Sequence, residues 1–250
     1  MSILEDLFSL EGKIAFVTGG SRGLGREIAL AYAACGADVV VVSRKLDACE
    51  EVAHEIEALG RRALPLACHV GDWDSIDAAV TEVYDRWGRI DILVNNAGMS
   101  PLAPSSAETS EALFDKVVGV NFKGPFRLAA TVGQRMYDAG SGVIINVSST
   151  GALRPAPHIA PYAASKAGLN VLTEAFAKEF GPRVRVNTLS AGPFLTDVST
   201  HWAPEKREHQ PSALGRPGRP EEVVTTALYL ASPASSYTSG ALVRVDGGLP

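Results

Sequence analysis

The sequence predicts an α/β fold, in which a parallel sheet of about seven strands carries helices on both faces. Short apolar runs alternate with helical patterns along the 250 residues, and this alternation is typical of doubly wound sheets. The run DVVVVS at 38–43 lacks apolar–polar alternation, which indicates a strand covered on both faces. No linker or internal repeat divides the chain, so we expect one domain over residues 1–250.

The expected elements follow one another in regular order. KIAFVTGG at 13–20 reads as a strand ending in glycine, and residues 23–35 then show the apolar spacing of a helix. A second helix is expected over 46–59, ending at Gly60. Helical patterns fill most of the later gaps, between strands expected in ALPLACHV (63–70), DILVNN (91–96), GVIINVSS (142–149), VRVNTLS (184–190) and ALVRVDGG (241–248).

Composition and charge exclude several classes of function. The net charge is −5 and no basic run is present, which argues against nucleic-acid binding because phosphate neutralisation needs clustered Lys and Arg. The N-terminal MSILEDLFSLEGK carries acids and no long apolar core, so we expect no signal peptide, and no apolar run reaches membrane-span length. Three scattered cysteines and five histidines show neither a disulfide pattern nor metal-ligand spacing, which favours a cytoplasmic protein without a metal.

A glycine-rich turn joins the first strand to the first helix. TGGSRGLG at 18–25 places Gly19, Gly23 and Gly25 in a G-x-x-x-G-x-G pattern. Glycines there permit a tight turn and let backbone N–H groups approach a pyrophosphate at the helix N-terminus. A plain strand–helix turn is the alternative. The position after the first strand favours the dinucleotide-binding turn of a Rossmann-type sheet.

The end of the second strand bears on the choice of cofactor. An NAD site usually has an acid here for the ribose 2′-hydroxyl, whereas this chain has Ser43, Arg44 and Lys45. No carboxylate would repel a 2′-phosphate, and Arg22 in the glycine turn points to the same region. In the other interpretation, Arg44 and Lys45 are the solvated start of the next helix. We expect NADP(H), with NAD(H) as the alternative.

Two reactive side chains lie one helical turn apart in an alanine-rich stretch. PYAASKAG at 161–168 reads as helix, so Tyr162 and Lys166 leave the same face. A solvated helix face is the simple interpretation of such a pair. The rest of the sequence favours a chemical role instead.

Seven motifs together resemble the short-chain dehydrogenase/reductase family over nearly the whole chain. Each motif alone is weak, but their order and spacing are specific, and they resemble 3-oxoacyl-acyl-carrier-protein reductases and gluconate 5-dehydrogenases within that family. The motifs are TGGSRGLG (18–25), NNAG (95–98), VNFKG (120–124), INVSS (145–149), YAASK (162–166), RVNTLSAGPFLT (185–196) and VDGG (245–248).

The resemblance implies a catalytic set. Tyr162 resembles the general acid/base, and Lys166 resembles its partner, which lowers the tyrosine pKa by its positive charge and bonds the nicotinamide ribose. Ser149, thirteen residues before Tyr162, is preferred over Ser148 as the hydroxyl that orients the substrate oxygen. Asn121 resembles the residue whose backbone geometry holds a water linking Lys166 to solvent.

The resemblance also implies the cofactor contacts. Asn95 is expected to brace the central strands, Ala97 and Gly98 to pass close to the cofactor, and Thr196 to fix the nicotinamide carboxamide. The full expected set of cofactor contacts is Gly19, Ser21, Arg22, Gly23, Leu24, Gly25, Ser43, Arg44, Lys45, Val70, Asn96, Ala97, Gly98, Tyr162, Lys166, Gly192 and Thr196.

Two positions depart from the family pattern. Ala191-Gly192 followed by Pro193 stands where the family often has Pro-Gly, which shifts the expected nicotinamide wall slightly. His69 stands where an Asp is common, so the expected side-chain bond to adenine N6 is lost and Val70 remains as the adenine contact.

These assignments predict an NADP(H)-dependent ketone reductase or secondary-alcohol dehydrogenase. A catalytically silent dinucleotide sensor is the alternative from another class, and the complete set of Asn121, Ser149, Tyr162 and Lys166 argues against it. The substrate can be a 3-oxoacyl thioester, a sugar or polyol such as gluconate, or a hydrophobic ketone such as a steroid. By family resemblance we also expect a homotetramer or homodimer.

The substrate side of the site is expected to be mainly apolar. Residues 191–220 hold five prolines and the charged cluster PEKRE, so the part from about 193 to 213 is expected to form a lid near the carboxyl ends of the strands. The expected substrate contacts are Met99, Ser149, Leu153, His158, Phe194 and Trp202, with His158 as a polar wall or surface residue.

Overall fold

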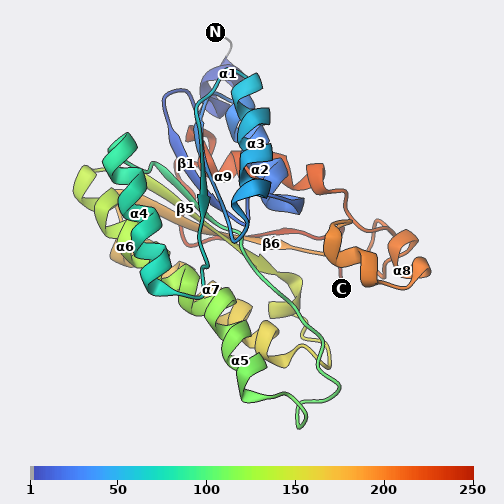
Figure 1. The fold of residues 1–250 in the computed structure, drawn as a ribbon. Coiled ribbons are helices and arrows are strands. Elements are labelled where there is room, and N and C mark those ends of the chain that lie inside the picture. Colours follow the sequence, from blue (N-terminus) through green and yellow to red (C-terminus); the bar gives the residue numbers. More distant parts are fainter. Residues whose placement is uncertain (1–2) are drawn as a thin grey trace.

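The computed structural model describes residues 3–250 and confirms the parallel sheet (Figure 1). Met1 and Ser2, where the predicted domain begins, lie outside the described residues. Seven parallel strands form one sheet in the order β3-β2-β1-β4-β5-β6-β7. Every predicted run contains one strand. The strands are β1 (Ile14–Thr18), β2 (Asp38–Ser43), β3 (Ala63–Ala67), β4 (Ile92–Asn95), β5 (Gly142–Ser149), β6 (Val184–Ala191) and β7 (Leu242–Val245).

Helices cover both faces of the sheet, and each face has its own apolar core. Alternate residues of β2 point to opposite sides, so Val41 packs under α2, α3 and α9 while Val40 packs under α4, α6 and α7. The predicted helices over 23–35 and 46–59 are confirmed, and each ends one residue earlier than predicted. The α-helices are α1 (Ile3–Phe8), α2 (Gly23–Ala34), α3 (Leu46–Ala58), α4 (Trp73–Trp87), α5 (Glu111–Val118), α6 (Gly124–Ala139), α7 (Ala160–Glu179), α8 (Pro204–Glu208) and α9 (Val224–Ala231).

A short π-helical turn, η1 (Gly119–Lys123), lies between α5 and α6. It holds Asn121 with its side chain fully buried. Where α6 begins, a Cβ on Gly124 would collide with the carbonyl oxygen of Val70, so the helix crosses the end of β3 at backbone distance. Such π-turns often occur at functional sites because they re-aim one side chain, and here that side chain is Asn121.

Buried polar side chains tie the central strands to α7. Asn95 Nδ2 of β4 donates to Asn146 Oδ1 of β5 (2.9 Å), and Asn146 Nδ2 donates to Thr173 Oγ1 of α7 (2.9 Å). Thr188 Oγ1 of β6 donates to the same threonine oxygen (2.8 Å). These four side chains are almost fully buried. The bracing role predicted for Asn95 is confirmed, and the network reaches further than predicted, to the helix that carries Tyr162.

The segment after β6 folds into short helices and then contacts the residues that follow β7. It contains the 3₁₀ turn η3 (Asp197–His201) and α8, which lies away from the sheet at the right of Figure 1. Its far end is held where Ala213 N donates to Gly248 O (3.1 Å) and Leu214 N donates to Gly247 O (3.0 Å). The predicted lid therefore has secondary structure and two fixed ends.

Candidate active site

The predicted site residues converge on one edge of the sheet. Gly19 follows β1, Ser43 ends β2, Asn96 follows β4, Ser149 ends β5 and Gly192 follows β6. Parallel strands end at the same edge, and the strand order reverses between β1 and β4. In open α/β sheets ligands bind in the crevice outside this switch point.

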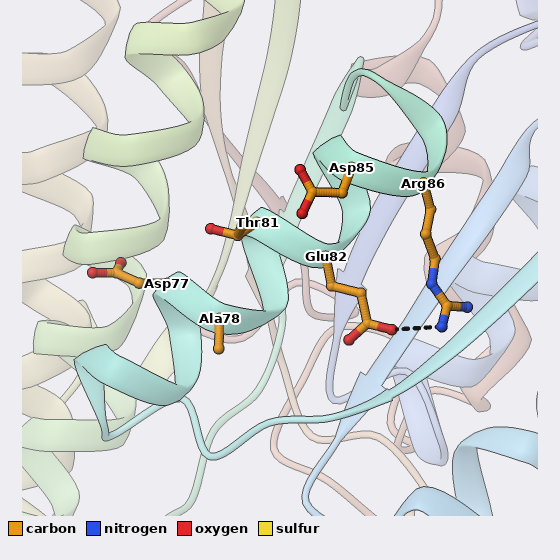
Figure 2. Close-up of a pocket in the computed structure, with 6 residues that line it drawn as sticks. All are labelled: Asp77, Ala78, Thr81, Glu82, Asp85 and Arg86. Atoms are coloured by element: carbon orange, nitrogen blue, oxygen red, sulfur yellow. Dashed lines mark ion pairs between the residues drawn. The ribbon is translucent and has the colours of Figure 1, made fainter.

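A second concave feature lies elsewhere, on the outer face of α4 (Figure 2). Figure 2 shows the Glu82–Arg86 ion pair on this face. No predicted site residue is among its lining residues, and it is an open surface hollow. We therefore place the site at the carboxyl edge of the sheet. The hollow is lined by Asp77, Ala78, Thr81, Glu82, Asp85 and Arg86.

The glycine turn has no room for side chains. A Cβ on Gly25 would collide with the backbone oxygen of Gly19 and the side-chain nitrogen of Asn96. Gly19 and Gly23 have φ values of 63° and 54°, a region that favours glycine. Arg22, the N-cap residue of α2, makes no side-chain cap bond. Side chains thus leave the first N–H groups of α2 uncapped, which suits an anion at this helix end.

Two side chains brace this turn from the neighbouring strand ends. Asn96 Nδ2 donates to the backbone oxygens of Thr18 (2.9 Å) and Gly19 (3.2 Å). Thr18 Oγ1 accepts from the backbone N–H groups of Asn96 (2.9 Å) and Ala97 (3.1 Å). Asn96 is predicted as a cofactor contact, and its side chain also shapes the cradle. Thr18 was not predicted as a site residue, although its position at the end of β1, directly before the first glycine, could have indicated this role.

The end of β2 presents two exposed cations. Arg44 and Lys45 are exposed, and within residues 3–250 neither side chain has an ion-pair partner. The Ser43 hydroxyl donates to Lys45 O (3.1 Å) and accepts from the thiol of Cys49 (3.1 Å). No carboxylate takes part in these contacts, as the cofactor prediction requires.

Arg22 differs from its prediction. It was expected to face the same region as Arg44, but its Nη1 donates to Asp197 Oδ2 at 3.1 Å, across the glycine turn. Thr196 packs there as well, since a Cβ on Gly23 would lie 3.4 Å from Thr196 Cγ2. The base of the predicted lid therefore touches the glycine turn. The sequence does not indicate this ion pair, because Asp197 is 175 positions away, and a contact of Arg22 with the cofactor stays a prediction.

Helix α7 carries Tyr162 in its first turn and Lys166 in its second, as predicted. Lys166 is only 3% exposed, and its Nζ donates to Val147 O at 2.7 Å. Burial disfavours the ammonium form and lowers the Lys166 pKa to about 8. An ammonium group has three N–H donors, so the bond to Val147 leaves capacity for a ribose hydroxyl.

The pKa of Tyr162 moves opposite to the sequence argument. Burial raises it, and hydrogen bonding with Ser149 lowers it by a smaller amount. The predicted lowering by Lys166 is wrong for the protein side chains by themselves, because the Lys166 ammonium is turned to the Val147 carbonyl. Tyr162 and Ser149 do lie together: a Cβ on Gly151 would be 3.6 Å from Tyr162 Cε1 and 3.3 Å from Ser149 Oγ.

The two candidate serines point in different directions. Ser148 is buried, and its hydroxyl donates to the backbone oxygen of Lys166 (3.2 Å). Ser149 is half-buried at the end of β5, and its Oγ accepts from Gly151 N (3.0 Å). Successive strand residues face opposite sides, so only one of them lies beside Tyr162. The structure places Ser149 there.

Asn121 contacts the loop after β4 through its whole amide. Its Nδ2 donates to Met99 O and Val117 O (both 2.9 Å), and its Oδ1 accepts from Met99 N (3.2 Å). A Cβ on Gly98 would lie 3.0 Å from Asn121 Oδ1 and 3.5 Å from Lys166 Nζ. Gly98 thus leaves the space open beside the lysine, at a position predicted to approach the cofactor.

The predicted substrate contacts are only partly brought together. Leu153 and Trp202 are half-buried near the ends of β5 and η3. Phe194 is only 6% exposed and packs in the apolar core, with a Cβ on Gly218 placed 2.6 Å from its ring. Phe194 thus offers little surface to a substrate, and its place among the substrate contacts stays a prediction. The sequence shows an aromatic side chain directly after β6, where a pocket wall is expected. It does not show that the chain at residue 218 folds back against that side chain.

The described part of the chain holds no group of three or more metal-ligating side chains. None of its helices is long and apolar enough to cross a membrane. The site therefore rests on the glycine turn, the α7 pair and the hydroxyl of Ser149.

Comparison with known proteins identifies the family and supports the fold. The family described as short chain dehydrogenase matches residues 13–207, most of the chain. This chain belongs to that family. The short-chain dehydrogenase membership accounts for the seven-stranded parallel sheet.

Similar short-chain dehydrogenases act on different substrates. A 3-oxoacyl-[acyl-carrier-protein] reductase of Thermotoga maritima is 39% identical over 244 residues, covering 96% of this chain and 98% of the relative. A gluconate 5-dehydrogenase of Burkholderia cenocepacia in complex with NADP and tartrate is 32% identical, covers 98% of both chains and gives a TM-score of 0.93. A 7α-hydroxysteroid dehydrogenase complexed with NADH and 7-oxo glycochenodeoxycholic acid is 33% identical. The match covers 99% of this chain and 98% of that one, with a TM-score of 0.92.

The chain is thus a dehydrogenase or reductase that acts on alcohol or ketone groups, as the motifs predicted. The silent-sensor alternative has no support among these relatives. The cofactor class is a nicotinamide dinucleotide, and NADP and NADH both occur in similar structures. The residues of this chain fit such a group, because the cradle at Gly19 and Gly25 is one that a Cβ would fill.

Replacement of the buried lysine tests the electrostatics of the site. Because burial lowers the Lys166 pKa from 10.5 to about 8, the unfolded chain binds this proton more tightly than the folded chain. The resulting penalty is complete below about pH 8 and disappears as the pH rises toward 10.5. At about 1.4 kcal/mol per pKa unit, it is on the order of 3 kcal/mol.

We expect Lys166→Met to be more stable than the wild type near neutral pH by about 1 to 2 kcal/mol, after the lost bond to Val147 O is subtracted. As the pH rises from about 8, the free energy of unfolding of the wild type should increase relative to that of the variant. Urea unfolding of both proteins across this range measures the difference. A difference independent of pH would show that Lys166 is not held in a charge-disfavouring site.

Proposed function

We propose that the protein is an NADP(H)-dependent reductase of ketones, or dehydrogenase of secondary alcohols, with Tyr162 as its general acid/base. The observation that carries this proposal is the grouping of Ser149, Tyr162 and Lys166 at the carboxyl end of β5, on the edge where the glycine turn lies. Reduction converts a carbonyl carbon to an alcohol by adding a hydride to carbon and a proton to oxygen. When bound, the nicotinamide group supplies or accepts the hydride.

The chain's residues supply the proton and the alignment. Since burial raises its pKa, Tyr162 stays protonated at neutral pH and can give its Oη proton to the substrate oxygen. Ser149 Oγ donates a hydrogen bond to the same oxygen and holds it in place. Lys166 has N–H capacity beyond its bond to Val147 O, and with it positions the ribose. Asn121 hydrogen-bonds the backbone of Met99 and so orders the loop after β4.

Other contacts with the dinucleotide follow from the same edge of the sheet. We assign the diphosphate to the backbone of residues 19–25 and the adenine to Val70. Ala97 and Gly98 contact the ribose of the nicotinamide half. Gly192 and Thr196 contact the nicotinamide, and Thr196 already lies over Gly23.

Tyr162→Phe should reduce turnover by a factor on the order of 10² to 10⁴, because the ring stays and the proton-carrying oxygen is removed. NADPH affinity should be unchanged within about twofold, because the phenol oxygen is not needed to hold the dinucleotide. Steady-state kinetics and NADPH fluorescence titration measure both. Near-normal turnover would refute the role of Tyr162.

Ser148 and Ser149 form a matched pair for the same assay. Ser149→Ala should impair turnover strongly, whereas Ser148→Ala removes a hydroxyl that bonds the Lys166 backbone and should have the smaller effect. The reverse order would assign substrate orientation to the wrong serine.

The preference for NADP(H) rests on the end of β2. A charge-assisted bond to the 2′-phosphate contributes about 1.5 to 3 kcal/mol, and solvent screening removes part of it. Arg44 is the main candidate, with Lys45 beside it. Arg22 contributes less than first expected, since it is paired with Asp197.

We expect NADPH to be favoured over NADH by about tenfold or more in kcat/KM at low salt. Ser43→Asp should weaken NADPH use by adding a repelling carboxylate, and Arg44→Ala should do so with little effect on NADH. Kinetics with both cofactors at low and high salt provide the test. If the wild type prefers NADH at low salt, Arg44 and Lys45 do not bind the 2′-phosphate and are only the solvated start of a helix.

An activity assay with several classes of carbonyl compound identifies the substrate class. The relatives act on acyl-carrier thioesters, sugar acids and steroids by name, so one panel should contain a 3-oxoacyl thioester, keto-gluconates and hydrophobic ketones. Oxidation of NADPH followed at 340 nm identifies the class.

In this proposal residues 1–250 act as one dinucleotide-binding domain, with 193–213 as a lid that closes over the substrate. The motivating observation is the short, exposed helical pieces η3 and α8 between fixed ends. Amide hydrogens in 193–213 should exchange faster than those of β5. Exchange as slow as in the strands would argue against a moving lid.

We further propose a cytoplasmic homotetramer or homodimer. Phe114 of α5 and Val171 of α7 are exposed (48% and 68%) on two helices packed together, an apolar surface suited to association. The thiols of Cys35, Cys49 and Cys68 are all free, as suits a reducing compartment. Light scattering on the purified protein and fractionation of the cells test the two statements.

A further inference from the structure

His158 has an unusual backbone for its residue type. Its φ is 70°, and it is the only non-glycine residue with positive φ in residues 3–250. Such a conformation is strained for a residue with a Cβ and persists where the surroundings hold it. The residue lies four positions before Tyr162, next to the start of α7.

Two hydrogen bonds hold His158 to the loop after β4. Its ring Nδ1 lies 3.1 Å from Ala103 O, and its own backbone oxygen accepts from Ala103 N at 3.1 Å. A carbonyl oxygen only accepts, so Nδ1 carries the proton in this contact. This ring nitrogen is therefore bound to the protein itself.

The loop over residues 100–109 depends on this contact. Met99, at its start, is held by Asn121, and Ser110, at its end, caps α5. Inside the loop, Ser105 bonds only with Glu108 and Thr109. In the described part of the chain, the two bonds to His158 are the hydrogen bonds that join 100–109 to the remainder of the protein.

The contact joins two walls of the proposed site. The loop continues from Gly98, which lies beside Lys166 and Asn121. His158 belongs to the connection from Ser149 to Tyr162. This contact therefore links the segment beside Lys166 to the segment that leads into Tyr162. It also keeps Ala103 buried while its neighbour Leu102 stays exposed (77%).

We propose that His158 is a positioning residue that clasps loop 100–109 to the start of α7, and so sets how closely a carbonyl substrate is held beside Tyr162. This inference rests on the proposed reductase function for its kinetic consequence. The clasp itself does not depend on that function.

Two substitutions separate the ring from the backbone. His158→Gly adopts φ of 70° without strain and loses only the ring bond. His158→Asn tolerates positive φ and offers an amide N–H in place of Nδ1, so it is the matched control.

Hydrogen exchange measures the clasp without any substrate. In His158→Gly, exchange of residues 100–109 should rise about threefold or more, while β5 is unchanged. His158→Asn should stay near the wild type. Equal exchange in His158→Gly and the wild type would overturn the proposal, as would equal acceleration in both variants, because the backbone rather than the ring would then hold the loop.

Kinetics measure the positioning. With the best carbonyl substrate of the wild type, His158→Gly should raise KM about three- to tenfold, with kcat and NADPH affinity within about twofold, and His158→Asn should restore KM. A fall in kcat at unchanged KM would overturn the role. If the wild type reduces no carbonyl compound, the proposed function fails, and hydrogen exchange still decides whether the clasp exists.

Discussion

Helix α7 is held against the middle of the sheet by hydrogen bonds that lie out of reach of water. Thr173 accepts from side chains of β5 and β6, Ser148 donates to the backbone of Lys166, and Lys166 donates back to Val147 O. Buried polar groups are costly unless every partner is in place, so this set allows one register of helix on strand. That register brings Tyr162 beside Ser149 and Lys166 beside Gly98.

The same packing determines the charge state of the site. An apolar helix–sheet contact that fixes Tyr162 also removes water from it, which favours the neutral phenol over the phenolate. Lys166 is disfavoured as a cation for the same reason. The protein therefore keeps a proton available on Tyr162 and a marginal charge on Lys166, an arrangement with a stability cost that functional sites commonly carry.

The sequence predicts the elements well, because apolar runs and glycine punctuation are local signals. Six strands lie within the predicted runs, and β6 passes its run by one residue, at Ala191. Helix α7 carries Tyr162 and Lys166 on one face. Contacts between distant segments do not follow from these local signals. Arg22 pairs with Asp197, and the ring of Phe194 packs against Gly218. Neither partner can be predicted from spacing along the chain. The direction of the Tyr162 pKa depends on burial, which a motif does not report.

The strand order has a consequence for how the protein is made. After β1, every strand pairs with one that precedes it in the chain, since β2 joins β1, β3 joins β2, β4 returns to β1, and β5 to β7 follow outward. A chain leaving the ribosome therefore never has to wait for a later strand in order to extend its sheet. The half that carries the glycine turn is complete first, whereas Thr188 and the far edge come last. Nucleotide recognition and catalytic geometry are thus acquired in sequence during synthesis.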